Sequence, residues 1–249
     1  MVINMFWRKI TKCKVGREVV LLSTESVREF KRAKGYATKE PGTLKWIENN
    51  FKTGDVIYDI GANIGQYSLY PAKLLKGDCK VYAFEPEALN FAKLNYNIKL
   101  NDLSKSVLAY PIALINENKL DKLYLKRFGY GEAFSAFGVA KDNLNKDFEP
   151  VHIEGSIGLT LDSLVFDYGL EQPNHIKIDV DGIERKVVEG GDRVMADNRL
   201  KSVLLETTRS EGWEERERWF KDFFKERNMA LSDYEASGRI TQNLIFKRQ

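Results

Sequence analysis

The sequence predicts an α/β protein with a doubly wound, mostly parallel sheet, and three observations support this class. Short apolar runs of strand length alternate with longer segments whose apolar residues recur every three or four positions. One run, Val56–Ile60, leads through a turn of small residues directly into a helical pattern. Acidic residues repeatedly follow the apolar runs. Strands that alternate with helices form parallel sheets, because each helix carries the chain back across one face.

Length and charge limit the possible organisation. The 249 residues suffice for one such domain with a sizeable core. We expect an N-terminal extension over 1–41 and a main domain over 42–249, with an insertion at about 116–161. Lys and Arg number 39 against 36 Asp and Glu, a net charge of +3, which does not indicate a nucleic-acid partner. Basic residues near the start predict a solvated arm, with contact to an anionic surface as the alternative: Arg8, Lys9, Lys12, Lys14 and Arg17.

Targeting and cysteine signals are weak. The apolar patch Val2–Trp7 is shorter than a signal-peptide core and precedes its basic residues. No run approaches the ~20 apolar residues that a transmembrane helix needs. Cys13 and Cys79 are too few for a disulfide framework or a zinc site, and both are compatible with free thiols in a reducing compartment. We therefore expect a cytoplasmic protein without a transmembrane segment; the sequence does not indicate an oligomeric state.

The elements follow in order from local patterns. Leu44, Ile47 and Phe51 recur at helical steps, and Thr53–Asp55 then breaks that helix before the first strand. The remaining apolar periods predict helices over 88–100, 184–189 and 213–227. Strands are expected over 56–60, 81–84, 107–110, 175–182, 202–206 and 242–247, the fourth of them ending in acidic residues. Ile112–Leu114 is expected at the carboxyl end of the third of these strands.

The stretch from Asn116 to Leu161 departs from this alternation. It consists of short polar and aromatic pieces with several glycines, which is typical of an insertion over a binding site. Its first part carries four aromatic residues: Phe128, Tyr130, Phe134 and Phe137. These side chains either cover a ligand or fill a small separate core against a hairpin.

The turn after Val56–Ile60 predicts a nucleotide-cofactor site. Gly61 and Gly65 lack a Cβ, so the backbone can turn sharply and approach a ligand. Glu85, at the end of the next strand, can accept hydrogen bonds from both ribose hydroxyls. A dinucleotide fingerprint would need a third glycine where Gln66 stands. S-adenosylmethionine is therefore favoured over NAD, with Asp59 as a partner for its ammonium group; a turn without ligand explains the glycines but not Glu85.

Candidate site residues gather at the carboxyl ends of the expected strands, where open α/β sheets bind ligands. They are Asp59, Glu85, Ala113, Asp179 and Glu206. Methyl transfer to a hydroxyl needs positioning and a base. Asp179 is the first candidate base and Asp181 the second, although either can instead cap the following helix.

Two further possibilities concern the imidazoles and a metal ion. His175 begins its strand at the opposite end of the sheet, which favours a structural role, whereas His152 lies in the insertion and could reach the mouth of the site. Asp179, Asp181 and Glu206 could hold a divalent cation. Three acids on separate loops do not specify a metal site, so none is expected.

Five separated motifs together resemble the FkbM family of class I S-adenosylmethionine-dependent methyltransferases. They are Asp59–Gly65, Phe84–Pro86, Thr160–Leu164, Lys177–Glu184 and Glu189–Gly191, in that order within roughly 54–246. One departure is Asp181, where the family usually has Glu, so the same charge has a shorter reach.

The resemblance implies a Rossmann-like seven-stranded sheet whose last strand, at 242–247, runs antiparallel, with the insertion before the fourth strand. It implies that Asp59, Gly61, Asn63 and Gly65 line the methionine end of the cofactor and that Glu85 holds the ribose. Ala62 and Ala113 are further candidates for contact with the cofactor. The acceptor pocket would form from 128–137 and 179–182. The expected activity is O-methylation of a sugar or glycan hydroxyl; the alternatives are a small secondary metabolite, a nitrogen acceptor, or a catalytically silent ligand-binding module.

Overall fold

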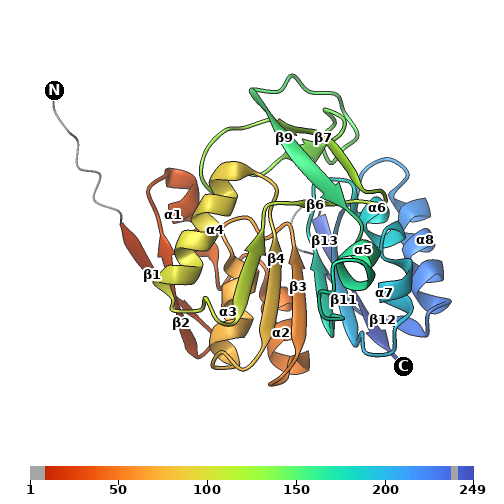
Figure 1. Ribbon diagram of the computed structural model, residues 1–249, viewed down its shortest axis with the longest axis horizontal. Helices are drawn as coiled ribbons and strands as arrows, with labels where there is room; N and C mark the ends of the chain where they lie inside the picture. The colour runs from red at the N-terminus through yellow and green to blue at the C-terminus, as the bar shows by residue number, and fades with distance from the viewer. Residues whose placement is uncertain (1–8, 237–240) are drawn as a thin grey trace.

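The computed structural model describes residues 9–236 and 241–249, and its centre is a seven-stranded sheet (Figure 1). The strand order is β12-β13-β11-β10-β3-β4-β5. Their bounds are β3 (Val56–Ile60), β4 (Lys80–Phe84), β5 (Val107–Tyr110), β10 (His175–Ile178), β11 (Ser202–Thr208), β12 (Met229–Ala236) and β13 (Thr241–Arg248). β13 pairs antiparallel with both β11 and β12, and the other pairs are parallel. The expected sheet, with 242–247 in the antiparallel strand, is confirmed.

Helices cover both faces of this sheet, as expected for a doubly wound fold. One core contains side chains from α2 (Pro41–Asn50), α3 (Gln66–Leu74) and α4 (Ala88–Leu100). The other contains side chains from α5 (Leu161–Phe166), α6 (Glu184–Glu189), α7 (Asp192–Ala196) and α8 (Trp213–Lys225). Neighbouring strand residues alternate between the cores, so Ile57 packs in the first and Tyr58 in the second. This alternation requires strands that are apolar on both faces, as the sequence has them.

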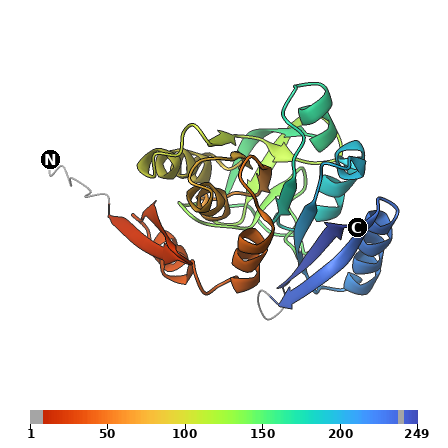
Figure 2. The ribbon, with the colours of Figure 1, turned by 90° about the horizontal axis from the view of Figure 1, so that it is seen from below.

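The N-terminal segment is folded onto the domain from residue 10 onward. β1 (Ile10–Val15) and β2 (Glu18–Ser23) form an antiparallel hairpin, and α1 (Val27–Gly35) follows. Val15, Val20 and Leu22 are fully buried in the first core. Lys12, Lys14 and Arg17 are exposed, as expected for a solvated basic segment, but the segment is a hairpin packed against the domain and not a free arm. Figure 2 shows the hairpin at one end and β12 and β13 at the other.

The insertion forms a second sheet with the order β6-β9-β7-β8. These strands are β6 (Ala113–Leu114), β7 (Lys119–Leu125), β8 (Ser135–Phe137) and β9 (His152–Leu159). In Figure 1 this sheet lies above the main sheet. The sequence predicted Ala113–Leu114 at the carboxyl end of β5. These residues instead form a separate strand that pairs with β9. Ala113, Ile115, Leu123, Leu125 and Phe137 form a small core there.

No helix in the described ranges is both long and apolar enough to cross a membrane.

Candidate active site

A cavity of about 410 Å³ opens at the carboxyl ends of the central strands. Its lining comes from the glycine turn after β3, from the end of β4, from β6, from the loop after β10 and from 132–137 of the insertion. Predicted site residues in its wall are Gly61, Asn63, Glu85, Ala113, Asp179 and Asp181. The tertiary structure therefore brings together strand ends that are far apart in the sequence, at the position where parallel α/β sheets bind ligands.

The two glycines of the turn are required by positive φ angles and by close packing. Gly61 has φ +81°, and a Cβ there would lie 1.9 Å from the carbonyl oxygen of Asp179. Gly65 has φ +93°, and its Cβ would lie 2.6 Å from Leu94 Cδ1. Both positions need a residue without a side chain, since positive φ is costly for other residues. The sharp turn expected from the sequence is present, and the glycines also allow the end of β3 to contact the end of β10 and α3 to contact α4; a close ligand approach stays a prediction.

Glu85 holds the turn from the end of β4. Its Oε2 accepts from the backbone N–H of Asn63 at 2.7 Å, and its Oε1 accepts from that of Glu87 at 3.0 Å. Burial raises the pKa of Glu85 to about 8, while the two backbone donors oppose that rise. Each carboxylate oxygen has a further lone pair, so the side chain can still accept bonds from a ligand in the cavity.

Three predicted cofactor residues do not line the cavity: Asp59, Ala62 and Gly65. Asp59 is 1% exposed, and its Oδ2 accepts from Ser68 Oγ at 2.5 Å. Burial raises its pKa, and the nearby ammonium of Lys177 opposes this. Asp59 therefore lies behind the wall of the cavity, and a direct contact with a ligand ammonium stays a prediction.

Asp179 forms an ion pair with a buried lysine. Lys177 Nζ lies 2.7 Å from Asp179 Oδ2, and the lysine side chain is 3% exposed. The Lys177 ammonium also lies 4.7 Å from the centre of the Tyr67 ring. Although burial acts to raise the pKa of Asp179, the Lys177 charge and hydrogen bond hold it below its usual value. Asp179 is therefore an ionised carboxylate that already has a cationic partner.

Asp181 has a different environment two residues further along the chain. Its Oδ2 accepts from the backbone N–H groups of Phe134 at 2.6 Å and Ser135 at 3.2 Å. Burial and the negative charge of Asp179 raise its pKa to about 6, and the two N–H donors oppose this. The side chain links the β10 loop to the insertion, and its pKa lies close to neutral pH.

A second cavity of about 720 Å³ adjoins the first. Asp181 lines both, as do Phe137, Asn143 and Ile183. The second wall includes hydroxyl and amide side chains from the insertion, β11 and the loop after it: Asn143, Asn145, Thr207, Thr208 and Ser210. Asp181, whose pKa is close to neutral pH, therefore lies where the two cavities meet.

Glu206 also reaches the first cavity, from β11. Burial, followed by the charges of Asp179 and Glu40, raises its pKa to about 9. Its Oε2 is buried without a hydrogen-bond partner among the described residues. At neutral pH this side chain is a neutral acid that can donate a hydrogen bond.

The two histidines lie away from the cavities. His175 is 1% exposed, with Ser202 Oγ 2.7 Å from Nδ1 and Asp55 Oδ2 3.1 Å from Nε2, at the amino end of its strand. His152 is exposed beside Phe128, at 4.9 Å between ring centres. Within the described ranges, no three or more His, Cys, Asp or Glu side chains gather in a way that could hold a metal ion.

Sequence reasoning missed the cations of the first cavity. Arg28, Arg32 and Lys39 line it, and all three come from α1 and the loop that follows. Lys177 was also given no role, although it neutralises Asp179. The sequence could have predicted an acidic partner for Lys177, because this lysine lies in an otherwise apolar strand and an unpaired charge is costly to bury. For the N-terminal cations the sequence shows only ordinary helical spacing.

The fold and the cavity define a Rossmann-like enzyme of the class I methyltransferase type. Residues 59–236 match the methyltransferase FkbM domain, and the chain belongs to that family. Its cofactor is accordingly S-adenosylmethionine. The chain is 29% identical over 187 residues to the methyltransferase sdnD of Sordaria araneosa, covering 66% of this chain and 70% of that protein.

Other relatives are more distant. The 31-O-demethyl-FK506 methyltransferase FkbM of Streptomyces tacrolimicus is 27% identical over 158 residues, covering 56% of this chain and 60% of that protein. A crystal structure of an FkbM methyltransferase from Methylobacillus flagellatus superposes with a TM-score of 0.54 at 14% identity, over 79% of this chain and 44% of that one. A putative transferase from Pyrococcus horikoshii gives 0.51 at 16%, over 96% and 71%. These two likenesses support the fold.

The cavity suits the chemistry of S-adenosylmethionine. Glu85 offers acceptors for the ribose hydroxyls at the end of β4. The methionine end carries both an ammonium and a carboxylate, and the wall supplies both signs of charge, with Asp179 and Arg32 among them. The volume of about 410 Å³ lies in the range of cofactor pockets.

Proposed function

We propose that the chain methylates a hydroxyl of a sugar unit, in a glycan or a glycan precursor, and that Asp181 takes up the hydroxyl proton. One observation carries this proposal: Asp181 lines both the cavity suited to the cofactor and the adjoining polar cavity. An acceptor in the second cavity would present its hydroxyl at the boundary between them.

The chemistry divides between cofactor and protein. S-adenosylmethionine, when bound, would supply an electrophilic methyl group for transfer to an acceptor oxygen. The protein aligns the reactants and removes the hydroxyl proton. A base works best when its pKa is near the working pH. Asp181, with a pKa of about 6, fits that role better than Asp179, whose pKa Lys177 lowers. Asp181 is therefore the preferred base, whereas the sequence favoured Asp179.

The second cavity supports a polyhydroxylated acceptor. Its amide and hydroxyl side chains can each donate and accept hydrogen bonds, as sugar hydroxyls do. Phe137 adds an aromatic ring shared with the first cavity. The net charge of +3 gives little general attraction to a nucleic-acid acceptor.

A small secondary metabolite is the second candidate acceptor. Its support comes from a relative, because the Streptomyces tacrolimicus protein is named as a methyltransferase of 31-O-demethyl-FK506. Such an acceptor would also be methylated on oxygen, so the role of Asp181 would be unchanged. The two candidates differ in what fills the second cavity.

The test begins with isothermal titration of the purified protein with S-adenosylmethionine and NAD. Micromolar binding of S-adenosylmethionine alone justifies an acceptor screen with methyl-labelled cofactor against oligosaccharides, nucleotide sugars, polyketides and amines. Labelled O-methyl sugar supports the proposal. Transfer only to polyketides or amines overturns the sugar assignment, and binding of NAD alone contradicts methyl transfer.

A further inference from the structure

The charges in the wall of the first cavity are divided between two parts of the chain. Its cations, among the described residues, are Arg28, Arg32 and Lys39, from the N-terminal segment. Its acidic residues all come from later elements: Glu85, Glu132, Asp179, Asp181 and Glu206. The cations lie outside the family match, which begins at residue 59. The N-terminal segment therefore adds positive charge to an otherwise acidic cavity.

Arg32 differs from the other two cations in having no acidic partner. Arg28 Nε lies 3.7 Å from Glu132 Oε2, and Lys39 Nζ lies 2.8 Å from Glu40 Oε1. No carboxylate in the described ranges lies within 4.0 Å of the Arg32 guanidinium. Its Nε donates to the carbonyl of Gly131 at 2.6 Å, which fixes the plane of the group. The Nη donors, for which no bond is found within the described chain, remain available to an anion.

Arg32 is also near the strand ends that hold the cofactor. Burial raises the pKa of Glu85 and of Asp181, and the positive charge of Arg32 opposes that rise at both. The backbone carbonyl of Arg32 accepts from Gln66 Nε2 at 3.3 Å, at the first residue of α3. Tyr36, one turn later, donates from its hydroxyl to the carbonyl of Gln66. Arg32 therefore lies beside the helix that follows the glycine turn, within electrostatic reach of β4 and β10.

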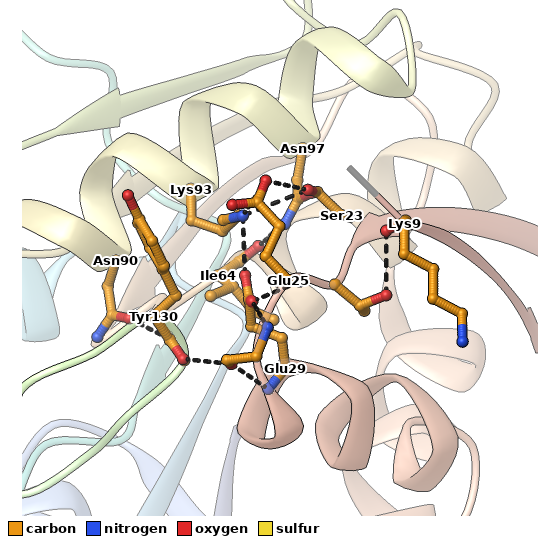
Figure 3. A network of polar contacts seen from close by, with 12 residues as sticks. Lys9, Ser23, Glu25, Glu29, Ile64, Asn90, Lys93, Asn97 and Tyr130 are labelled. Atoms are coloured by element: carbon orange, nitrogen blue, oxygen red, sulfur yellow. Dashed lines mark hydrogen bonds and ion pairs between the residues drawn. The ribbon is translucent and has the colours of Figure 1, made fainter. Parts of the chain in front are cut away.

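A buried network holds α1 in this position (Figure 3). Lys93 of α4 is 5% exposed, and its Nζ lies 3.0 Å from Glu29 Oε1 and 3.2 Å from Glu25 Oε1. Glu29 completes a capping box with Ser26 at the start of α1. Asn97 accepts from the backbone N–H of Ser23 and donates to the carbonyl of Ile64, both at 2.9 Å. The same network thus ties α1 and β2 to the glycine turn.

The insertion is attached to the same network. Ser26 Oγ donates to the carbonyl of Tyr130 at 3.1 Å, and Asn90 Oδ1 accepts from the N–H of Gly131 at 2.8 Å. Gly131 in turn accepts from Arg32. The guanidinium is therefore oriented from both sides, by its helix and by the loop it contacts, before any ligand binds. Preorganised donors of this kind lose little freedom on binding an anion.

We infer that Arg32 binds the carboxylate of the methionine moiety of S-adenosylmethionine, so that the N-terminal segment forms one wall of the cofactor site. Planar guanidinium groups match carboxylates through two parallel hydrogen bonds. The other charged groups of the cofactor are cationic, and the acids of the cavity suit them. This inference rests on the cofactor and hence on the proposed methyl transfer; it adds a residue that positions the cofactor from outside the family domain.

The test compares S-adenosylmethionine with its decarboxylated analogue, which lacks only the carboxylate. Dissociation constants are measured by isothermal titration for the full chain, for Arg32→Gln and for Lys31→Gln, a matched control on the same helix that lies outside the cavity. Arg32→Gln should weaken binding of S-adenosylmethionine roughly 10- to 100-fold, the usual effect of a lost charge-assisted pair. Binding of the analogue should be unchanged or tighter, because a repelling cation has been removed. Lys31→Gln should change both constants by less than about threefold, since this exposed side chain of α1 does not line the cavity.

The other outcomes separate this inference from the proposed function. Equal weakening of both compounds by Arg32→Gln would show a purely structural role and overturn the inference. Unchanged binding of both compounds to Arg32→Gln would also overturn the inference, but it would leave the assignment of S-adenosylmethionine as the cofactor intact. A parent chain that binds neither compound would overturn the inference together with the methyltransferase function. Circular dichroism of both variants checks that α1 remains folded.

Discussion

Asp179 and Asp181 lie in one loop but differ in protonation behaviour. Lys177 neutralises Asp179 and lowers its pKa, whereas burial and the charge of Asp179 raise the pKa of Asp181 to about 6. A pair of acids whose pKa values are separated by their environments is typical of a catalytic site. The sequence ranked Asp179 before Asp181 as the base, whereas the neighbours of the two side chains favour Asp181.

The pH dependence of turnover tests this difference. A base must be ionised to accept a proton, so the rate should fall as the pH decreases below about 6, the pKa of Asp181. Asp181→Asn should lower kcat by about 10²- to 10⁴-fold, the usual contribution of a general base, and remove this limb. The amide can still accept from Phe134, so cofactor affinity should be retained. The readout is kcat against pH, with the dissociation constant of S-adenosylmethionine alongside.

Asp179→Asn provides the control for that profile. Because the charge of Asp179 raises the pKa of Asp181, removing it should move the acidic limb to lower pH without abolishing it. If the limb disappears in Asp179→Asn and persists in Asp181→Asn, the assignment of the base is reversed.

Gly61 is a second residue whose requirement is local and testable. Gly61 and Gly54 have almost the same φ, +81° and +82°, but a Cβ at Gly54 would meet nothing within 4 Å. Gly54→Ala should cost about 1–2 kcal/mol for the left-handed backbone alone. Gly61→Ala should cost a further 1–3 kcal/mol or so, because its Cβ overlaps the carbonyl of Asp179. Urea unfolding measures both, and equal losses would contradict the close contact between β3 and β10.

At the scale of elements, the predicted and observed helices and strands agree best where neighbouring residues alone determine the element. α4 at Ala88–Leu100 and β5 at Val107–Tyr110 have the bounds expected from apolar periodicity and turns. β12 was missed because its residues Ser232, Asp233 and Glu235 interrupt the apolar pattern of a strand at the sheet edge. The hairpin of β1 and β2 was not predicted, because basic residues stand close to its buried apolar residues Val15, Val20 and Leu22. In both cases pairing with a partner, rather than local propensity, decides the structure.

The attachment of α1 gives a prediction for an element. Lys93→Met leaves the carboxylate of Glu29, which is 0% exposed, without its cation. Breaking a buried pair on one side usually costs about 3–5 kcal/mol. Lys99→Met, at an exposed position of the same helix, should change the free energy of unfolding by less than about 0.5 kcal/mol. Chemical unfolding measures both variants.

A double variant separates the charge from the packing. Adding Glu29→Gln to Lys93→Met removes the unpaired buried charge, so it should restore part of the lost stability. If Lys93→Met is as stable as Lys99→Met, then α1 is not held by this network.

At the scale of the whole molecule, the first cavity, which we propose as the cofactor site, is lined by segments from most of the chain. α1, the glycine turn, 131–137 and the loop after β10 all contribute to one cavity. Binding of S-adenosylmethionine at 100 times its dissociation constant should stabilise the fold by about 2.7 kcal/mol. Amide exchange should slow in α1 and in 130–135 together, while α8 and β12 change little. Protection confined to the glycine turn would contradict a wall formed by the N-terminal segment.

The sequence by itself determined the parallel α/β class, the glycine turn, Glu85 at the second strand end and the family, because each is encoded in residues that are neighbours or in ordered motifs. The tertiary structure alone decided that Arg32 lines the first cavity, that Asp59 lies behind its wall and that Asp181 is shared by two cavities. The physical reason is that charge pairing and burial depend on which distant segments pack together. Lys177 beside Asp179, and Lys93 beside Glu29, are contacts of that kind.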